Sequence, residues 1–85
     1  GLFRLWGSSG KPVAMMGALD GGAVSVHDSS GETAAFMMAT ENGGVLRIIN
    51  DSGKNVVSLR ADEDGYGEVG AWDSHGKGRT LNARD

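Results

Sequence analysis

Residues 43–61 read GGVLRIINDSGKNVVSLRA, in which two alternating segments flank a short run of turn-forming residues. Alternation of apolar and polar residues is the period-2 pattern of a half-buried β-strand. Asn, Asp and Ser side chains bond the nearby backbone in tight turns, and glycine adopts a left-handed conformation at no steric cost. The stretch therefore predicts a β-hairpin with a tight turn that ends at Gly53.

The same hairpin recurs along the chain. Four glycines anchor the turns, with spacings of 21, 22 and 23 residues: Gly10, Gly31, Gly53 and Gly76. Such spacing indicates a tandem repeat of about 22 residues. We therefore interpret residues 1–85 as one domain of repeat units, at 10–30, 31–52 and 53–75, with partial units at 1–9 and 76–85.

A second turn in each unit varies in length, from residues 20–22 to 41–44 to 63–67. Insertions are tolerated at exposed loop tips, so the strands keep their register while this turn changes. A helix is excluded because every ten-residue segment contains a glycine or a turn cluster. The sequence predicts an all-β fold, an antiparallel up-and-down meander of about eight short strands.

The predicted sheet has two unlike faces. One is almost wholly apolar, as in Leu46, Ile48, Val57 and Leu59, and we expect it to form the core. The other mixes arginines with apolar residues. A single layer cannot bury both faces, and large exposed apolar patches mark interfaces. We therefore expect a homo-oligomer, a dimer or a trimer packed as a prism, with a small closed β-barrel as the alternative.

One column of the repeat, four places before each anchoring glycine, holds large or aromatic residues: Trp6, His27, Ile49 and Trp72. Tryptophan rings are suited to stacking on sugars, which makes carbohydrate a candidate ligand of this column. Ile49 in the same column favours packing instead. We interpret the column as a subunit interface or a ligand platform.

The densest acidic cluster contains Asp62, Asp64 and Glu68 around a bend at Gly65. Closely spaced carboxylates with a glycine at the bend suit calcium, which prefers oxygen ligands. The helix-flanked calcium loop pattern is not met, however, and the acids are equally explained as turn formers. Calcium is therefore kept as a possible cofactor, bound at this hairpin tip.

Composition excludes several classes of function. The net charge of −3 and the absence of a basic stripe argue against nucleic-acid binding. The chain has no apolar run of ~18 residues, so no membrane span is expected, and it has no cysteine for disulfides or thiolate metal sites. His27 and His75 lack partners at catalytic or ligand spacing. We expect no catalytic residue and no enzymatic activity.

Residues 45–59 and 72–77 are similar to the last hairpin of a WD-repeat propeller blade, but a blade needs ~40 residues, so we attribute this to shared hairpin chemistry. The alternation from Gly10 to Asp73 more closely resembles glycine-anchored hairpin arrays of bacterial secreted and surface proteins and fibrous spike modules. That resemblance implies a structural or presenting element in an extracellular, cell-surface or particle-associated setting.

The chain begins at Gly1, inside a repeat unit, which is typical of a segment of a longer protein. We expect a non-enzymatic structural, oligomerisation or presentation module. The alternative is a module that binds carbohydrate or calcium at its hairpin tips.

Overall fold

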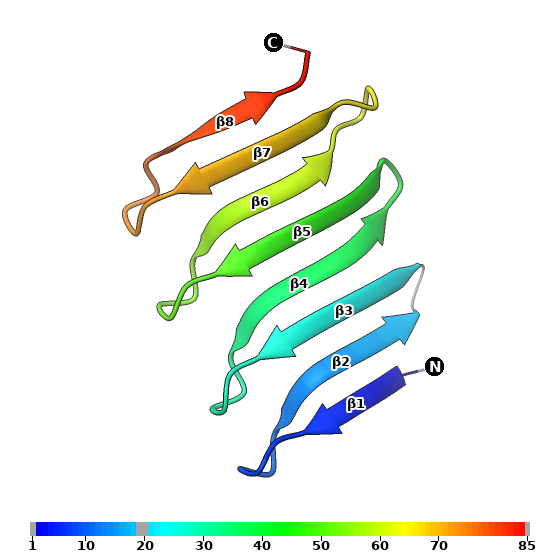
Figure 1. Cartoon of the computed structure of the whole chain (residues 1–85), viewed down its shortest axis with the longest axis vertical. Coiled ribbons are helices and arrows are strands. Elements are labelled where there is room, and N and C mark those ends of the chain that lie inside the picture. Colours follow the sequence, from blue (N-terminus) through cyan, green and yellow to red (C-terminus); the bar gives the residue numbers. More distant parts are fainter. Residues whose placement is uncertain (1, 19–20, 85) are drawn as a thin grey trace.

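A computed structural model describes residues 2–18 and 21–84, which contain eight strands and no helix. The strands are β1 (Leu2–Trp6), β2 (Pro12–Ala18), β3 (Gly22–His27), β4 (Thr33–Thr40), β5 (Gly43–Ile49), β6 (Asn55–Ala61), β7 (Gly67–Trp72) and β8 (Gly78–Asn82). They form one antiparallel sheet in the order β1 to β8 (Figure 1). The predicted all-β meander of eight strands is confirmed.

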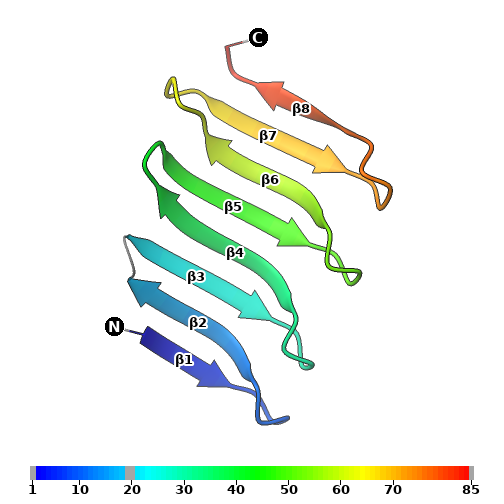
Figure 2. The ribbon, with the colours of Figure 1, turned by 180° about the vertical axis from the view of Figure 1, so that it is seen from behind.

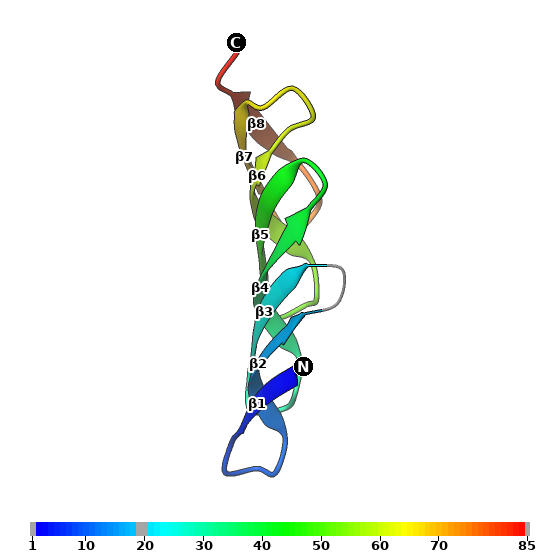
Figure 3. The same ribbon diagram turned by 90° about the vertical axis from the view of Figure 1, so that its right-hand side faces the viewer.

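The sheet is open and single-layered. Its extents are 45 × 32 × 12 Å, and Figure 3 shows it edge-on as one twisted layer. β1 and β8 lie at opposite ends, and no part of the described chain covers either face (Figures 1 and 2). The alternative of a small closed barrel is therefore wrong, because β1 pairs only with β2 and β8 only with β7.

The glycine-anchored turns share one geometry. In the turn between β5 and β6, the Asn50 N–H donates to the Lys54 carbonyl (2.9 Å), and Asn50 Oδ1 accepts from Ser52 N (2.9 Å) and Lys54 N (3.1 Å). Gly53 has φ +81°, a left-handed conformation that side chains disfavour. The side chain of residue 50 and the glycine together specify this turn.

The turn between β6 and β7 has the same geometry, although the sequence places it among the variable turns. Asp62 N donates to the Tyr66 carbonyl at 2.8 Å, Asp62 Oδ1 accepts from Asp64 N and Tyr66 N, and Gly65 has φ +86°. The other variable turn that is fully described is tighter, because Thr40 pairs directly with Gly43. The variation is thus a change of turn type between units.

The cross-strand register places one apolar residue from every strand in a single row: Phe3, Met16, Val24, Met37, Leu46, Leu59, Val69 and Leu81. A second row on the same side runs Leu5, Ala14, Val26, Ala35, Ile48, Val57, Ala71 and Arg79. We call this side the apolar face. The opposite side, the mixed face, carries residues such as Phe36, Arg47 and Ser58.

Burial within one chain does not follow hydrophobicity. On the apolar face Phe3 is 60% exposed and Leu81 is 67% exposed. The most buried side chains among the described residues are Val45, Asp62 and Asn82, none of which belongs to the apolar rows. The face that we expected to be the core is therefore open in the single chain, because the layer has nothing stacked on it.

Candidate functional site

The predicted platform residues lie in a row along the edge that carries the glycine-anchored turns, one at the end of each odd-numbered strand. The sheet register shifts at Trp6, His27 and Ile49, where β-bulges precede the turns. Successive members are two strands, or about 10 Å, apart. The structure therefore aligns the four residues without bringing them into one cluster.

The four side chains of this row differ in their exposure and in their contacts. Trp6 is 61% exposed, whereas His27, Ile49 and Trp72 are half-buried. His27 uses both ring nitrogens, because Nε2 shares a hydrogen bond with Ser25 Oγ (2.9 Å) and Nδ1 shares one with Thr33 Oγ1 (3.3 Å). This histidine joins β3 to β4 by hydroxyl contacts.

Trp72 lies over its own strand. A Cβ atom added at Gly70 would come within 2.9 Å of both Cζ2 and Cζ3 of the indole, so the ring rests on the bare backbone of Gly70. Gly70 is buried although the sheet has a single layer. The other units carry Arg4, Ser25 or Arg47 two residues before the column, so only this unit leaves room for the ring.

An open hollow of about 440 Å³ adjoins this ring on the mixed face. We call it the Trp72 groove, and six side chains line it: Arg47, Asn55, Ser58, Arg60, Glu68 and Trp72. Among these six, the sequence identifies Trp72 as a platform residue and Glu68 as a calcium candidate, but it does not bring the two together in one site. The missed signal is the pairing of Gly70 with Trp72, which no other unit has.

The two arginines of the groove differ in charge pairing. Arg60 Nε donates to Glu68 Oε1 at 2.9 Å, and this contact is the main cause that raises the pKa of Arg60 and lowers the pKa of Glu68. The Arg47 guanidinium forms no ion pair or side-chain hydrogen bond with the rest of residues 2–18 and 21–84. A positive charge is therefore left available in the groove.

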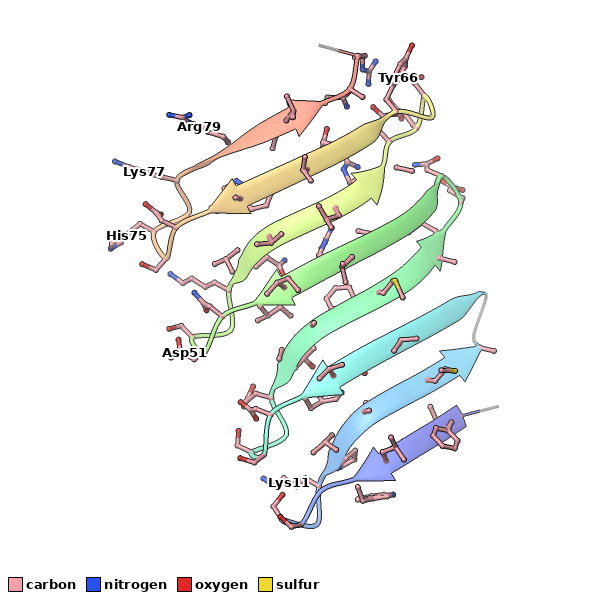
Figure 4. The ribbon with its side chains drawn as sticks, viewed as in Figure 1. Lys11, Asp51, Tyr66, His75, Lys77 and Arg79 are labelled. Carbon is pink, nitrogen blue, oxygen red and sulfur yellow. The ribbon has the colours of Figure 1, made fainter. Side chains whose placement is uncertain are left out.

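A polar cluster joins the turn between β6 and β7 to the end of β8, and we call it the C-terminal clasp: Asp62, Asp64, Tyr66, Asn82 and Arg84. Arg84 donates through Nη2 to Asp62 Oδ2 and through Nη1 to Asp64 Oδ2, both at 2.8 Å. Its guanidinium lies 5.3 Å from the centre of the Tyr66 ring. Figure 4 labels Tyr66 at this corner, far from the turns that hold Lys11 and Asp51.

Asp62 is the centre of the clasp and is only 4% exposed. Its Oδ1 accepts from the amides of Asp64 and Tyr66, and its Oδ2 accepts from Asn82 Nδ2 (2.8 Å) as well as from Arg84. The hydrogen bond from Asn82 and the Tyr66 amide lower the pKa of Asp62 to about 2. A carboxylate so fully hydrogen-bonded is held in its charged form.

The carboxylates proposed for calcium are bound within the chain. Asp62 and Asp64 share Arg84, while Glu68 binds Arg60 through Oε1 and accepts from Asn82 through Oε2 at 3.3 Å. In the described part of the chain, no three His, Cys, Asp or Glu residues are grouped so as to hold a metal ion. The calcium hypothesis therefore gains no support from this arrangement.

No protein-family model matches the chain, and no curated protein matches it either. Within residues 2–18 and 21–84, no helix has the length and apolar character needed to cross a membrane.

Proposed function

We propose that the chain is a non-enzymatic structural module that assembles by covering its apolar face with the same face of another copy. The observation that carries this proposal is the exposure of nine large apolar side chains on that face: Phe3, Leu5, Met16, Val26, Met37, Ile48, Leu59, Val69 and Leu81. Each is between 38% and 67% exposed in the single chain. The exposed surface is continuous because the register aligns these residues in two rows.

The size of the face supports a stable interface. Monomeric proteins rarely expose contiguous apolar patches larger than a few hundred Å². A standard interface buries ~800 Å² on each partner, and the apolar rows run through all eight strands of a sheet whose extents, turns included, are 45 by 32 Å. Burial stabilises by about 25 cal/mol per Å² of apolar surface, so covering this face supplies the core that one layer lacks.

The chemistry of the face favours another copy as the occupant. Arg79 is the only charged residue in its two rows of described residues, so the face offers no charge pattern for a charged partner. Flat apolar sheets pack on one another at a separation of ~10 Å. Ala18 and Ala39 border a hollow of about 730 Å³ that extends from β1 to β5, which leaves room for larger side chains of the second copy.

Assembly through the apolar face leaves the mixed face and both turn edges outward. The exposed turns, with residues such as Asp51, His75 and Lys77 in Figure 4, then vary without affecting the core. This arrangement suits a spacing or presenting element of a larger extracellular or particle-associated protein. Two sheets face to face, or three around an axis, both bury the apolar face.

The test is the mass of the chain in solution by light scattering over a range of concentrations. We expect two or three times the mass of one chain. Leu59→Asp places a charge on the apolar face and should give a monomer, whereas Ser58→Asp, the neighbour on the mixed face, should leave the assembly intact. A folded wild-type monomer at all concentrations contradicts the proposal.

A further inference from the structure

We propose that the Trp72 groove on the mixed face binds an acidic carbohydrate. The site goes beyond assembly, since it lies on the opposite side of the sheet from the apolar rows. It joins β5, β6 and β7 and has three properties that recognition of a charged sugar needs. These are a fixed aromatic surface, an unpaired guanidinium and several partners for hydroxyl groups.

The aromatic surface is held in place by the chain itself. Because Gly70 has no side chain, the indole of Trp72 lies against the backbone of β7 and is half-buried. Its orientation is therefore set before any ligand arrives, which lowers the entropy lost on binding. Trp6, at the equivalent position of another unit, follows Arg4 instead of glycine and is mostly exposed.

Arg47 selects for negative charge. It stands on the middle row of the mixed face, opposite Ser58 in β6, and has no ion-pair partner among the described residues. A guanidinium binds a carboxylate or sulfate through two parallel hydrogen bonds. The groove holds two arginines and one carboxylate, Glu68, so it is locally positive in a chain of net charge −3.

The remaining lining suits hydroxyl groups. Asn55 offers an amide that both donates and accepts, Ser58 offers a hydroxyl, and Glu68 offers carboxylate lone pairs. A volume of about 440 Å³ falls within the range of small-molecule sites. An apolar ligand would leave these polar groups without partners, whereas a sugar ring satisfies them around the indole.

Single-stranded nucleic acid is the main competitor, since bases stack on tryptophan and phosphates bind arginine. Such binding relies on a positively charged groove that follows several phosphates. Glu68 interrupts the positive charge here, and the acidic side chains of the clasp, Asp62 and Asp64, lie beyond it. The observations therefore favour an acidic sugar that places one of its acidic groups at Arg47.

The experiment is isothermal titration calorimetry of the full chain with tri-galacturonate, neutral galactotriose and a short oligo-dT. We expect tri-galacturonate to bind at least tenfold more tightly than either of the others. Equal binding of the neutral sugar removes the role of Arg47, tighter binding of oligo-dT identifies a nucleic-acid site, and no binding of tri-galacturonate overturns the proposal.

The repeat supplies matched variants. Arg47→Ser and Trp72→Ile introduce residues found at the same columns in other units, and each should weaken tri-galacturonate binding at least tenfold. Trp6→Ile is the control and should leave the affinity unchanged; an equal loss contradicts the assignment to this groove. If circular dichroism shows that Trp72→Ile does not fold, the affinity of Arg47→Ser for tri-galacturonate alone tests the proposal. Where Leu59→Asp gives a monomer that is folded by circular dichroism, it should still bind, which separates this site from assembly.

Discussion

The exposure of the two faces of the sheet differs from what their compositions suggest. In the single chain the apolar face is open, with Met37 51% exposed, whereas buried Val45 lies in a row with Arg60 and Glu68 on the mixed face. Long polar side chains cover neighbouring apolar atoms with their stems, and here they shield their own face. Hydrophobicity therefore indicates which face the proposed assembly has to cover.

The largest expected effect comes from truncating neighbouring side chains that lie on opposite faces of the sheet. Leu46→Ala on the apolar face should lower the free energy of unfolding by about 3 kcal/mol, as for a core leucine, because a second copy buries this residue in the proposed assembly. Val45→Ala on the mixed face removes less apolar volume and should cost about 1.5 kcal/mol. Urea unfolding at one fixed protein concentration compares the two variants. A smaller loss for Leu46→Ala would mean that the apolar face stays open.

The next largest effect tests the ring on the mixed face. Gly70→Ala places a Cβ within 2.9 Å of the Trp72 indole and should destabilise the chain by about 1–3 kcal/mol, because the ring has to move. Gly67→Ala is the matched control on β7, since its Cβ would meet no atom within 4 Å. Thermal unfolding and tryptophan fluorescence measure both. Equal stability of the two variants would show that Gly70 is not needed for the position of Trp72.

Much of the fold was predictable because local signals repeat. Period-2 alternation places the strands, and the turn pattern that ends at Gly53 sets the register that aligns Leu46 with Leu59. The choice between an open layer and a closed barrel was not fixed by the sequence, because the composition of one chain does not state what covers its apolar face. The oligomer remains a prediction.

The candidate sites were harder to predict, because they depend on contacts between units. Asp62 and Asn82 meet across β7, yet they are 20 residues apart, close to one repeat period. Residues one period apart lie two strands apart on the same side, so the clasp was visible in principle as opposite charges at that spacing. The Trp72 groove was not visible in the sequence, because it depends on the bare backbone at Gly70 and on three strands in register.

The clasp predicts how stability depends on pH. Because the pKa of Asp62 falls from 3.8 to about 2 on folding, its contribution is present above pH 3.8 and is lost as the pH falls toward 2. Asp62→Asn should therefore lower the melting temperature at pH 7 and flatten its decline between pH 4 and 2. Asp51→Asn, in an exposed turn, is the control. An unchanged pH profile for Asp62→Asn would mean that the clasp does not hold the end of β8.

The smallest effect concerns the edge of glycine-anchored turns, where lysines link neighbouring turns. Lys54 Nζ donates to the Ser74 carbonyl at 2.8 Å and Lys11 Nζ donates to the Ser30 carbonyl at 3.0 Å, whereas Glu32, between them, has no ammonium to donate.

Lys54→Ala should lower the free energy of unfolding by about 0.5 kcal/mol, because a single exposed hydrogen bond contributes little. Glu32→Ala should change it by less, and Glu32→Lys should raise it by about 0.5 kcal/mol through a bond to the next glycine-anchored turn. Chemical unfolding of the three variants measures the order of their free energies of unfolding. A gain from Glu32→Lys would support this role of the lysine bonds, whereas a loss of stability would contradict it, because the edge would then not behave as its sequence suggests.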